Sequence, residues 1–445
     1  MRVSIIGAGY VGLVSGACLA EKGHSVVCVD NDRAKIDLIR KGIPPFFEEG
    51  LEELLGKTRG TGLEASTNLA EAVLESEITL IAVGTPFDGQ RIDLSYIREV
   101  THEIGMVLKN KSRYHVVVVK STVVPGTTDG VVLPILENTS GKRAGEEFGV
   151  GVNPEFLTEG KAIHDFMNPD RIVIGGIDDK TEDRIDSLYE SFDSTLRIRT
   201  NNRTAEMIKY ASNALLATMI SFSNEFASLC ARLGGIDIKD VMAGVHTSEY
   251  FSTVDSSGKV LTAPITKYLE AGCGFGGSCL PKDVKALVSH AEAAGLQLPL
   301  LSVVIAINVE QPNKVIELLG KHFDSPAGLS LAVLGLSFKP GTDDVRESPA
   351  FPVMRTLLDG GANLRAYDPA AIETARHVLD DPRIVYCSSL REAVTGVDAV
   401  FLLTRWKEFL ELPEILRAMV PTPVLIDGRR LIDKSSVERY EGIGL

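Results

Sequence analysis

The first thirty residues read as a strand, a glycine-rich turn, a helix and a second strand, and this order leaves few folds open to the chain. Residues 2–6 are a short apolar run, and a second apolar run at 25–29 ends at Asp30. Between them lie three glycines in GxGxxG spacing, Gly7, Gly9 and Gly12. They allow a tight turn, a close approach of a pyrophosphate to the backbone, and packing of the helix on the strand. Because an acid at the second strand end accepts hydrogen bonds from ribose hydroxyls, the segment predicts an NAD site that disfavours NADP.

Further apolar runs predict that this unit continues as a parallel sheet. They lie at residues 78–83, 116–119 and 149–152, and each is followed by a polar or glycine-bearing loop. Ligands of an open parallel sheet bind outside the carboxyl ends of its strands. We therefore expect the loop residues to gather near the cofactor: Thr85, Pro86, Ser121, Thr122, Glu155 and Glu159. The alternatives are turn-making or helix capping for the hydroxyl groups and a solvated face for the glutamates, which share a face only if their segment is helical.

A long helix is expected at residues 203–233, which contain neither Gly nor Pro. Apolar side chains occur around most of its circumference, so we expect burial on several sides and a role as spine and dimer interface. Lys209 and Asn213 form an i, i+4 pair within this apolar stretch. A snorkelling lysine and a surface asparagine are the alternative to a functional pair.

The stretch GCGFGGSCLPKD, residues 272–283, places a thiol in a glycine-dense loop. Its glycines permit close backbone approach, and Cys279 precedes Pro281, Lys282 and Asp283, which could open a helix through Val284–Ala293. A thiol at a helix N-terminus has a depressed pKa, as a nucleophile requires. A buried structural cysteine is the alternative.

The C-terminal third repeats the strand–helix order of the first. Strands are expected at 330–335, 363–367, 399–403 and 424–426, and the second of them ends in Asp368. The first loop lacks GxGxxG, so we expect Lys339 and Arg346 as phosphate contacts, with Arg429 and Arg430 as a weaker pair and a surface loop as the alternative. The fold class predicted is α/β, with two Rossmann-like doubly wound domains joined by a long central helix and a helical dimerisation domain. The expected domains are residues 1–200, 201–300 and 301–445.

Charge and cysteine usage limit the partners. A net charge of −14 over 445 residues argues against a non-specific nucleic-acid binder. Six scattered cysteines without a CxxC pair indicate neither a zinc site nor a disulfide framework. No basic leader and no apolar run of about 18 residues is seen, so we expect a cytoplasmic protein without a membrane partner.

Seven motifs in order resemble those of the nucleotide-sugar 6-dehydrogenases, the UDP-glucose and GDP-mannose dehydrogenase family. They are GAGYVG (7–12), VGTP (83–86), STVVPGTT (121–128), NPEFLTEG (153–160), EMIKYASNALLAT (206–218), GFGGSCLPKD (274–283) and LSFKPGTDDVRESP (336–349). The resemblance implies oxidation of a sugar C6 alcohol to a carboxylate with two NAD⁺. It implies that Cys279 forms a thiohemiacetal and then a thioester, and that Lys209 and Asn213 stabilise the oxyanion. Asp283 and Thr122 would hold a water and move protons, and Glu155 or Glu159 would serve hydrolysis.

The resemblance also assigns binding residues, and it implies no metal. The cofactor set is Gly7, Gly9, Tyr10, Val11, Gly12, Asp30, Lys35, Gly84, Thr85, Pro86, Ser121, Thr122, Glu159 and Lys282. The substrate set is Phe156, Leu157, Lys209, Asn213, Tyr268, Gly276, Phe338, Lys339 and Arg346.

The sugar nucleotide is expected to be UDP-glucose, whose product UDP-glucuronate serves polysaccharide synthesis, with GDP-mannose or another NDP-hexose as alternatives. YLEAGCGFGGSC (268–279) resembles the UDP-glucose enzymes, but the arginine they carry across the dimer interface is Ala263 here, and FGVGVNPEFL (148–157) resembles the GDP-mannose branch. A homodimer is the implied assembly. Other classes left open are a two-electron hydroxyacid dehydrogenase, which needs no cysteine, and a nucleotide-binding protein without catalysis.

Overall fold

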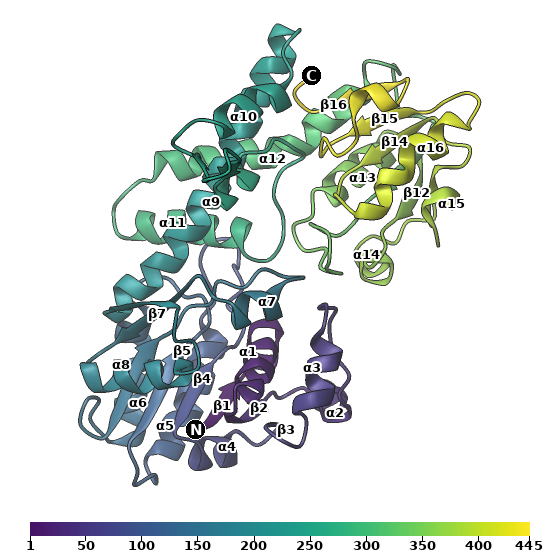
Figure 1. Cartoon of the computed structure of the whole chain (residues 1–445). Helices are drawn as coiled ribbons and strands as arrows, with labels where there is room; N and C mark the ends of the chain where they lie inside the picture. Colours follow the sequence, from purple (N-terminus) through teal and green to yellow (C-terminus); the bar gives the residue numbers. More distant parts are fainter. The chain divides into compact units, whose positions relative to one another are not determined.

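The computed structural model describes all 445 residues and divides into two compact units, Met1–Ser212 and Asn213–Leu445. Helix α9 (Asn202–Leu233) runs through the division between them (Figure 1). The predicted α/β class with two parallel sheets and a long joining helix is confirmed.

The first unit is built on an eight-stranded sheet with the order β3-β2-β1-β4-β5-β6-β7-β8. Neighbouring strands are parallel, except that β6 and β7 are antiparallel. The strands are β1 (Arg2–Ile6), β2 (Ser25–Val29), β3 (Leu63–Ser66), β4 (Ile78–Ile81), β5 (His115–Val119), β6 (Phe148–Val152), β7 (Arg171–Gly176) and β8 (Leu196–Thr200). The runs of Val and Ile in β4, β5 and β6 are buried on both faces, as expected of strands covered by helices on each side.

Two hydrophobic cores cover the two faces of this sheet. One contains side chains of α1, α2, α3 and α7, and the other contains side chains of α4, α5, α6 and the start of α9. The helices are α1 (Tyr10–Glu21), α2 (Arg33–Lys41), α3 (Leu51–Thr58), α4 (Leu69–Glu75), α5 (Ser95–Leu108), α6 (Leu133–Ser140), α7 (Ala162–Met167) and α8 (Asp179–Asp186). Polar loops at the carboxyl ends of the strands are left free of this packing, and they carry the residues singled out above.

The second unit combines helices with a six-stranded parallel sheet of order β13-β12-β11-β14-β15-β16. Its helices before the sheet are the end of α9, α10 (Ile238–His246), α11 (Leu280–Ala293) and α12 (Pro299–Leu319), with a small hairpin of β9 (Ser252–Val254) and β10 (Val260–Thr262). The sheet strands are β11 (Ser330–Leu334), β12 (Asn363–Tyr367), β13 (Ile384–Tyr386), β14 (Ala399–Leu402), β15 (Val424–Asp427) and β16 (Tyr440–Gly442). The helices between them are α13 (Ala350–Asp359), α14 (Ile372–Val378), α15 (Leu390–Val394) and α16 (Leu412–Arg417).

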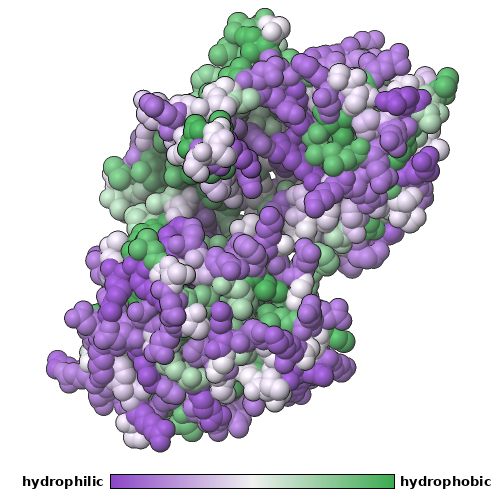
Figure 2. Space-filling view, viewed as in Figure 1, coloured by the Kyte–Doolittle hydropathy of each residue, from purple (hydrophilic) through white to green (hydrophobic).

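Helix α9 is less enclosed than its composition predicts. It is long and apolar enough to cross a bilayer by length and composition, and 44% of its most apolar 18-residue window is buried inside the protein. The part of α9 in the second unit keeps large apolar side chains exposed: Leu215, Phe222, Phe226, Leu229 and Leu233. Their spacing of seven, four, three and four residues places them along one stripe of the helix. Figure 2 shows apolar surface at the upper end of the view, where α9 ends.

Candidate functional site

The glycine-rich turn has the geometry that a dinucleotide requires. Gly7 has φ +102° and donates its N–H to the carbonyl of Val29 at 2.7 Å. A Cβ on Gly12 would lie 1.8 Å from the carbonyl oxygen of Gly7, so the helix reaches the strand only because this residue is glycine. A Cβ on Gly9 would meet nothing within 4 Å, and no side chain caps the first turn of α1. The N–H groups of this uncapped first turn have no acceptor within the helix, and they lie at its positive end, which fits a pyrophosphate.

The acid predicted to bind ribose lies beside this turn. One carboxylate oxygen of Asp30, Oδ2, accepts the backbone N–H of Ala8 at 2.9 Å and the ammonium of Lys35 at 2.9 Å. The other oxygen, Oδ1, accepts the N–H of Asp32 at 3.1 Å. The side chain is 10% exposed, and Oδ1, which accepts a single hydrogen bond from the protein, can accept a second one from a ligand. Lys35, part of the predicted cofactor set, thus acts on Asp30 as an ion-pair partner.

The loops after β4 and β5 are joined by their hydroxyl groups. The Oγ1 of Thr85 donates to the carbonyl of Thr122 at 2.8 Å, and the Oγ of Ser121 donates to the carbonyl of Val83 at 2.7 Å. Gly84 and Pro86 are exposed beside them. The two predicted loops therefore meet at one edge of the sheet, with their hydroxyl groups used to fix loop conformation.

A buried group of charges follows β5 and β6. Glu155 and Lys209 form an ion pair of 3.0 Å, with side chains 6% and 5% exposed, so neither belongs to a solvated face. Lys120 donates to Oδ1 of Asn153 at 2.9 Å. Burial alone would raise the pKa of Glu155, but the charge and hydrogen bond of Lys209 outweigh it and hold that pKa below its usual value. Burial lowers the pKa of Lys120 to about 8.

The segment that carries both glutamates, residues 153–160, is not helical, so Glu155 and Glu159 do not share a helix face. The carboxylate of Glu155 instead accepts the N–H of Leu157 at 2.6 Å, which closes a local turn. The ring of Phe156 is stacked by the guanidinium of Arg171 at 4.0 Å, and the ammonium of Lys209 lies 5.4 Å from its centroid. The loop therefore brings Phe156 and Leu157 of the predicted substrate set beside the Glu155–Lys209 pair.

In the second unit the predicted thiol lies at a helix start. Cys279 is the N-cap of α11, which begins four residues earlier than the sequence pattern indicated because Pro281 suits the first turn. It is the one cysteine of the six that is not buried. Asp283, one turn on, accepts the side-chain amide of Asn213 at 2.6 Å and the ammonium of Lys282 at 2.6 Å. Three of the predicted residues thus form one buried polar chain at the base of the cysteine turn.

The glycine loop before Cys279 is held from several sides. Asn308 bonds both backbone groups of Phe275, at 2.7 and 2.9 Å, and Asn224 accepts the N–H of Gly272 at 2.8 Å. A Cβ on Gly276 would lie 2.3 Å from the carbonyl oxygen of Glu347. The loop is thus pressed against other backbone, which is the physical reason for its glycines.

The loop after β11 meets this glycine loop. The N–H of Gly277 donates to the carbonyl of Arg346 at 2.9 Å, and the ring of Phe338 would be 2.7 Å from a Cβ on Gly277. The guanidinium of Arg346 is held by Asp344 and is 64% exposed, and the ammonium of Lys339 lies 5.4 Å from the Phe338 centroid. Tyr268, also in the predicted substrate set, ends a short 3₁₀ turn, Pro264–Tyr268, ahead of the loop.

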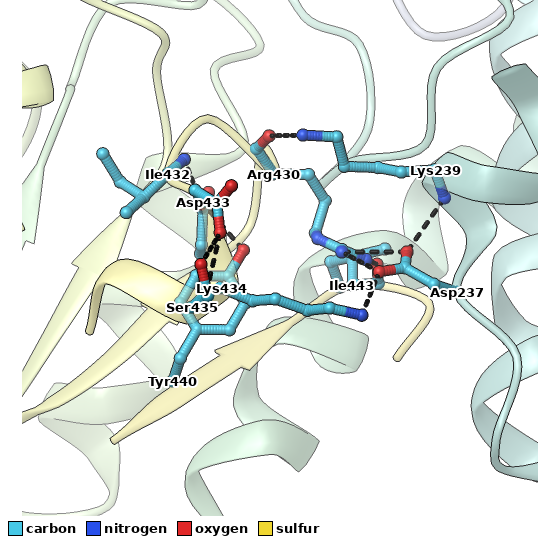
Figure 3. A network of polar contacts seen from close by, with 10 residues as sticks. Asp237, Lys239, Arg430, Ile432, Asp433, Lys434, Ser435, Tyr440 and Ile443 are labelled. Carbon is cyan, nitrogen blue, oxygen red and sulfur yellow. Dashed lines mark hydrogen bonds and ion pairs between the residues drawn. The ribbon is translucent and has the colours of Figure 1, made fainter. Parts of the chain in front are cut away.

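Arg430, expected as a weaker phosphate contact, is used inside the protein (Figure 3). It is 5% exposed, donates twice to the carboxylate of Asp237 at 2.8 and 2.9 Å, and reaches the carbonyl of Ile443 at 2.8 Å. Burial would raise the pKa of Asp237, but hydrogen bonds from Arg430 and Lys434 outweigh it and place that pKa well below its usual value. Arg429 donates to the carbonyls of Leu403 and Gly274. Arg430 thus joins the sheet to the start of α10, and Arg429 joins it to the glycine loop.

Some residues at these positions escaped the sequence analysis. They are Glu48, Lys120, Asn153, Glu206, Asn224 and Asn308. Glu206, one turn before Lys209, accepts the N–H groups of Gly126 at 2.5 Å and Thr128 at 2.9 Å, and so holds the loop after β5. The only local signal was a polar residue within an otherwise apolar or glycine-rich segment.

The turn, the acid and the carboxyl-edge loops define an NAD-binding dehydrogenase unit, and the comparisons with known proteins agree. The NAD binding domain of the UDP-glucose/GDP-mannose dehydrogenase family matches residues 1–193, its central domain matches 203–310, and its UDP binding domain matches 332–434. The chain belongs to this family and is an NAD-dependent nucleotide-sugar 6-dehydrogenase.

Its relatives include enzymes for more than one sugar. The chain is 39% identical to UDP-glucose 6-dehydrogenase AglM of Haloferax volcanii, with 100% of both chains covered. It is also 39% identical to GDP-mannose 6-dehydrogenase of Pseudomonas aeruginosa, covering 97% of this chain and 96% of the relative. Among solved structures, a UDP-glucose dehydrogenase from Pyrobaculum islandicum aligns with a TM-score of 0.89 at 36% identity, covering 99% of this chain and 97% of that one.

Proposed function

We propose that this dehydrogenase oxidises UDP-glucose to UDP-glucuronate in two NAD-dependent steps. The observation that carries the proposal is the combination, in one family member, of a buried Glu155–Lys209 pair and a Cys279 at the start of α11. A dehydrogenase that stops at two electrons needs no such thiol. The UDP-glucose relatives and the alignment with the Pyrobaculum islandicum enzyme support this choice of sugar.

The bound NAD⁺ supplies the hydride acceptor, once for each two-electron step. The N–H groups at the start of α1 would hold its pyrophosphate, and Asp30 would hold its ribose. Of the other proposed cofactor residues, Thr85 and Ser121 keep the adjoining loops in place through their bonds to carbonyl oxygens. Their contribution is to shape the edge of the sheet rather than to donate to the ligand.

Cys279 is proposed as the nucleophile. The alcohol first loses a hydride and a proton to become the aldehyde, and the thiolate of Cys279 then bonds to the C6 carbon. Loss of a second hydride, together with the hydroxyl proton, converts this thiohemiacetal to a thioester, and water then breaks its C–S bond to release the carboxylate and return the thiol. The position at a helix N-terminus favours the thiolate form, because the N–H groups there carry a partial positive charge.

The buried polar groups are proposed to handle protons and developing charge. Lys209 and Asn213 would donate to the oxyanion, the kind of preorganised interaction that contributes several kcal/mol, on the order of 3 per donor. Glu155, whose low pKa keeps it ionised at neutral pH, would act as base or position water for hydrolysis, with Glu159 as its neighbour in the loop. Asp283 and Thr122 would assist proton movement.

The C-terminal domain is proposed to bind the nucleotide through the loop of Phe338, Lys339 and Arg346, with Gly276 and Tyr268 on the sugar side. A homodimer is proposed as the assembly. It is supported by the exposed apolar stripe of α9, since a row of large exposed hydrophobic side chains is unusual on a monomer surface.

The test is NADH formation with a panel of UDP-glucose, GDP-mannose, UDP-galactose and UDP-N-acetyl sugars. We expect UDP-glucose to give the highest kcat/KM, with two NADH per sugar. One NADH per sugar with release of free aldehyde contradicts the four-electron assignment. The second candidate, GDP-mannose oxidation, rests on the equally similar GDP-mannose relatives and on Ala263 in place of the expected arginine, and the same panel decides it.

Cys279→Ser separates the thioester route from a route without covalent chemistry. We expect turnover to carboxylate to fall by on the order of 10³-fold or more, because serine is not ionised at neutral pH. Cys387→Ser, a buried cysteine of the sheet domain, is the control and should keep activity. Full turnover in Cys279→Ser would remove the thioester mechanism.

A further inference from the structure

A carboxylate that no sequence motif singled out joins the dinucleotide helix to the glutamate loop. Glu48 lies between α2 and α3 and is only 5% exposed. Its Oε1 accepts the N–H of Ala162 at 2.7 Å, and its Oε2 accepts the N–H of Gly160 at 2.6 Å and the phenol of Tyr10. The N–H of Gly160 also points to the Tyr10 oxygen at 3.1 Å. All these groups belong to the first unit.

The three segments that meet here are remote in sequence. Tyr10 is the first residue of α1 and belongs to the GxGxxG turn, and its ring lies 5.1 Å from that of Phe46, measured between centroids. Gly160 and Ala162 follow directly on the loop that carries Glu155 and Glu159. One side chain therefore bonds to both the cofactor turn and the end of the glutamate loop.

The strength of the link follows from burial and charge. Hydrogen bonds to a charged acceptor are roughly twice as strong as those to a neutral one. The pKa of Tyr10 is raised far above its usual value by burial and by the neighbouring carboxylate, so its hydroxyl stays protonated and donates at neutral pH. A carboxylate also accepts at both oxygens at once, which an amide cannot do.

We propose that Glu48 is a positioning residue of the dehydrogenase: it fixes the glutamate loop against the dinucleotide turn, so that Glu155 keeps its place relative to the bound cofactor. The proposal rests on the proposed function, since it gives the Glu155 loop a part in turnover. A purely structural role for Glu48 would stabilise α7 and the loop without affecting the cofactor or the reaction.

Two variants separate the contact of Glu48 with Tyr10 from its contacts with Gly160 and Ala162. Tyr10→Phe removes only the hydroxyl of Tyr10, so Glu48 still accepts the N–H groups of Gly160 and Ala162. We expect it to raise the Kd for NAD about threefold and to lower kcat at saturating NAD by less than Glu48→Gln does, because a neutral donor contributes modestly. Glu48→Gln leaves one N–H without an acceptor and places an amide N–H against a donor. We expect it to raise the Kd for NAD about tenfold and to lower kcat about tenfold, one charge-assisted hydrogen bond each.

The double variant gives the readout that a structural role would not produce. Because the phenol acts through Glu48, Tyr10→Phe/Glu48→Gln should bind NAD no more weakly than Glu48→Gln alone. Glu49→Gln, at the neighbouring exposed glutamate, is the matched control and should behave as the wild type. Thermal unfolding of each variant shows whether it is folded at the assay temperature.

Two results overturn the proposal. One is Glu48→Gln with wild-type Kd for NAD and wild-type kcat, even if its melting temperature falls. The other is a double variant whose fold-increase in the Kd for NAD equals the product of the two single-variant increases. That result would mean that Tyr10 and Glu48 affect NAD binding independently. If the wild type oxidises none of the sugars, the proposed function fails instead, and the Kd for NAD alone then decides between the link and a structural role.

Discussion

The two parallel sheets share their central strand order, and they differ in what the acid after the second strand does. Gly7 donates to Val29 at 2.7 Å in the first unit, and Gly335 (φ +90°) donates to Tyr367 at 2.8 Å in the second, so the turn after the first strand is built alike. Asp30 accepts only one hydrogen bond from the protein at Oδ1, which leaves that oxygen able to accept another. Asp368 is 1% exposed.

Every side of the Asp368 carboxylate is occupied by the protein. Its Oδ2 accepts the N–H groups of Leu336 and Ser337 at 2.8 and 3.0 Å, the Ser337 hydroxyl, and the indole N–H of Trp406 at 3.1 Å. Its Oδ1 accepts the N–H groups of Ala370 and Ala371, both at 2.9 Å. The same strand order therefore does not by itself make a dinucleotide site. Both acids accept an N–H of the turn, so what differs is how many further donors the protein supplies: three hydrogen bonds in all reach Asp30 and six reach Asp368.

The largest effect on stability should come from substitution of Asp368, whose carboxylate is fully bonded within the protein. Asp368→Asn places an amide N–H among donors, and we expect it to lower the free energy of unfolding by about 3 kcal/mol. Asp30→Asn, the same chemical change at the more open acid, should cost less, about 1 kcal/mol, because Asp30 accepts three hydrogen bonds from the protein where Asp368 accepts six. Thermal and urea unfolding of both variants measure this, and equal losses of stability would break the comparison.

For cofactor binding, we expect the substitution at Asp30 to have a larger effect than the substitution at Asp368. We expect Asp30→Asn to raise the Kd for NAD about tenfold and to narrow the preference over NADP, because a ribose–carboxylate interaction is lost and a negative charge near the 2′-position is removed. Asp368→Asn should leave the Kd for NAD unchanged. Titration calorimetry with NAD and NADP is the measurement, and a wild type that binds both cofactors equally would remove the role given to Asp30.

The ion pair of Figure 3 should give the second unit a pH dependence of its own. Since the folded pKa of Asp237 lies below its unfolded value, its contribution is present above about pH 4 and is lost as the pH falls further. We expect Asp237→Asn to lower stability by about 1 kcal/mol at pH 7 and by much less near pH 2.5. Asp240→Asn, exposed on the same helix, is the control, and a pH-independent loss would contradict the assignment.

A stability change at alkaline pH should come from the buried lysine after β5. Burial lowers the pKa of Lys120 to about 8, so between pH 8 and 10.5 the unfolded chain binds more protons than the folded one. The stability of the wild type should therefore rise in that range relative to Lys120→Met. Melting temperatures of the wild type and of Lys120→Met from pH 7 to pH 10 measure the difference in stability between them. Lys109→Met, at an exposed lysine, is the control. A constant difference would mean that Lys120 titrates normally.

The sequence predicted the parts of the fold that local chemistry determines. The strands at 2–6, 25–29 and 363–367 have the predicted bounds, because each is a β-branched or apolar run ended by a glycine or an acid. Strand β8 was missed, since its sequence LRIRT alternates charge with exposed apolar residues at the sheet edge and lacks the pattern of a buried strand.

The sequence indicated which residues form the candidate site, but it did not indicate which of them contact one another. Lys209 and Asp283 could be named from motifs, but their partners Glu155 and Asn213 follow from how distant segments meet. Glu48 lies in FFEEGLEE, which reads as a solvated loop. Its burial depends on Tyr10 and Gly160, more than thirty residues away on either side, and no local pattern carries that information.

The burial of the cysteines has a practical consequence. Five of the six thiols are enclosed and only Cys279 has access to solvent. A mild alkylating reagent will therefore modify one position per folded chain, and mass spectrometry can count intact molecules by their single adduct. The same selectivity makes this sulfur an attachment point for electrophilic inhibitors that carry a nucleotide as their recognition group.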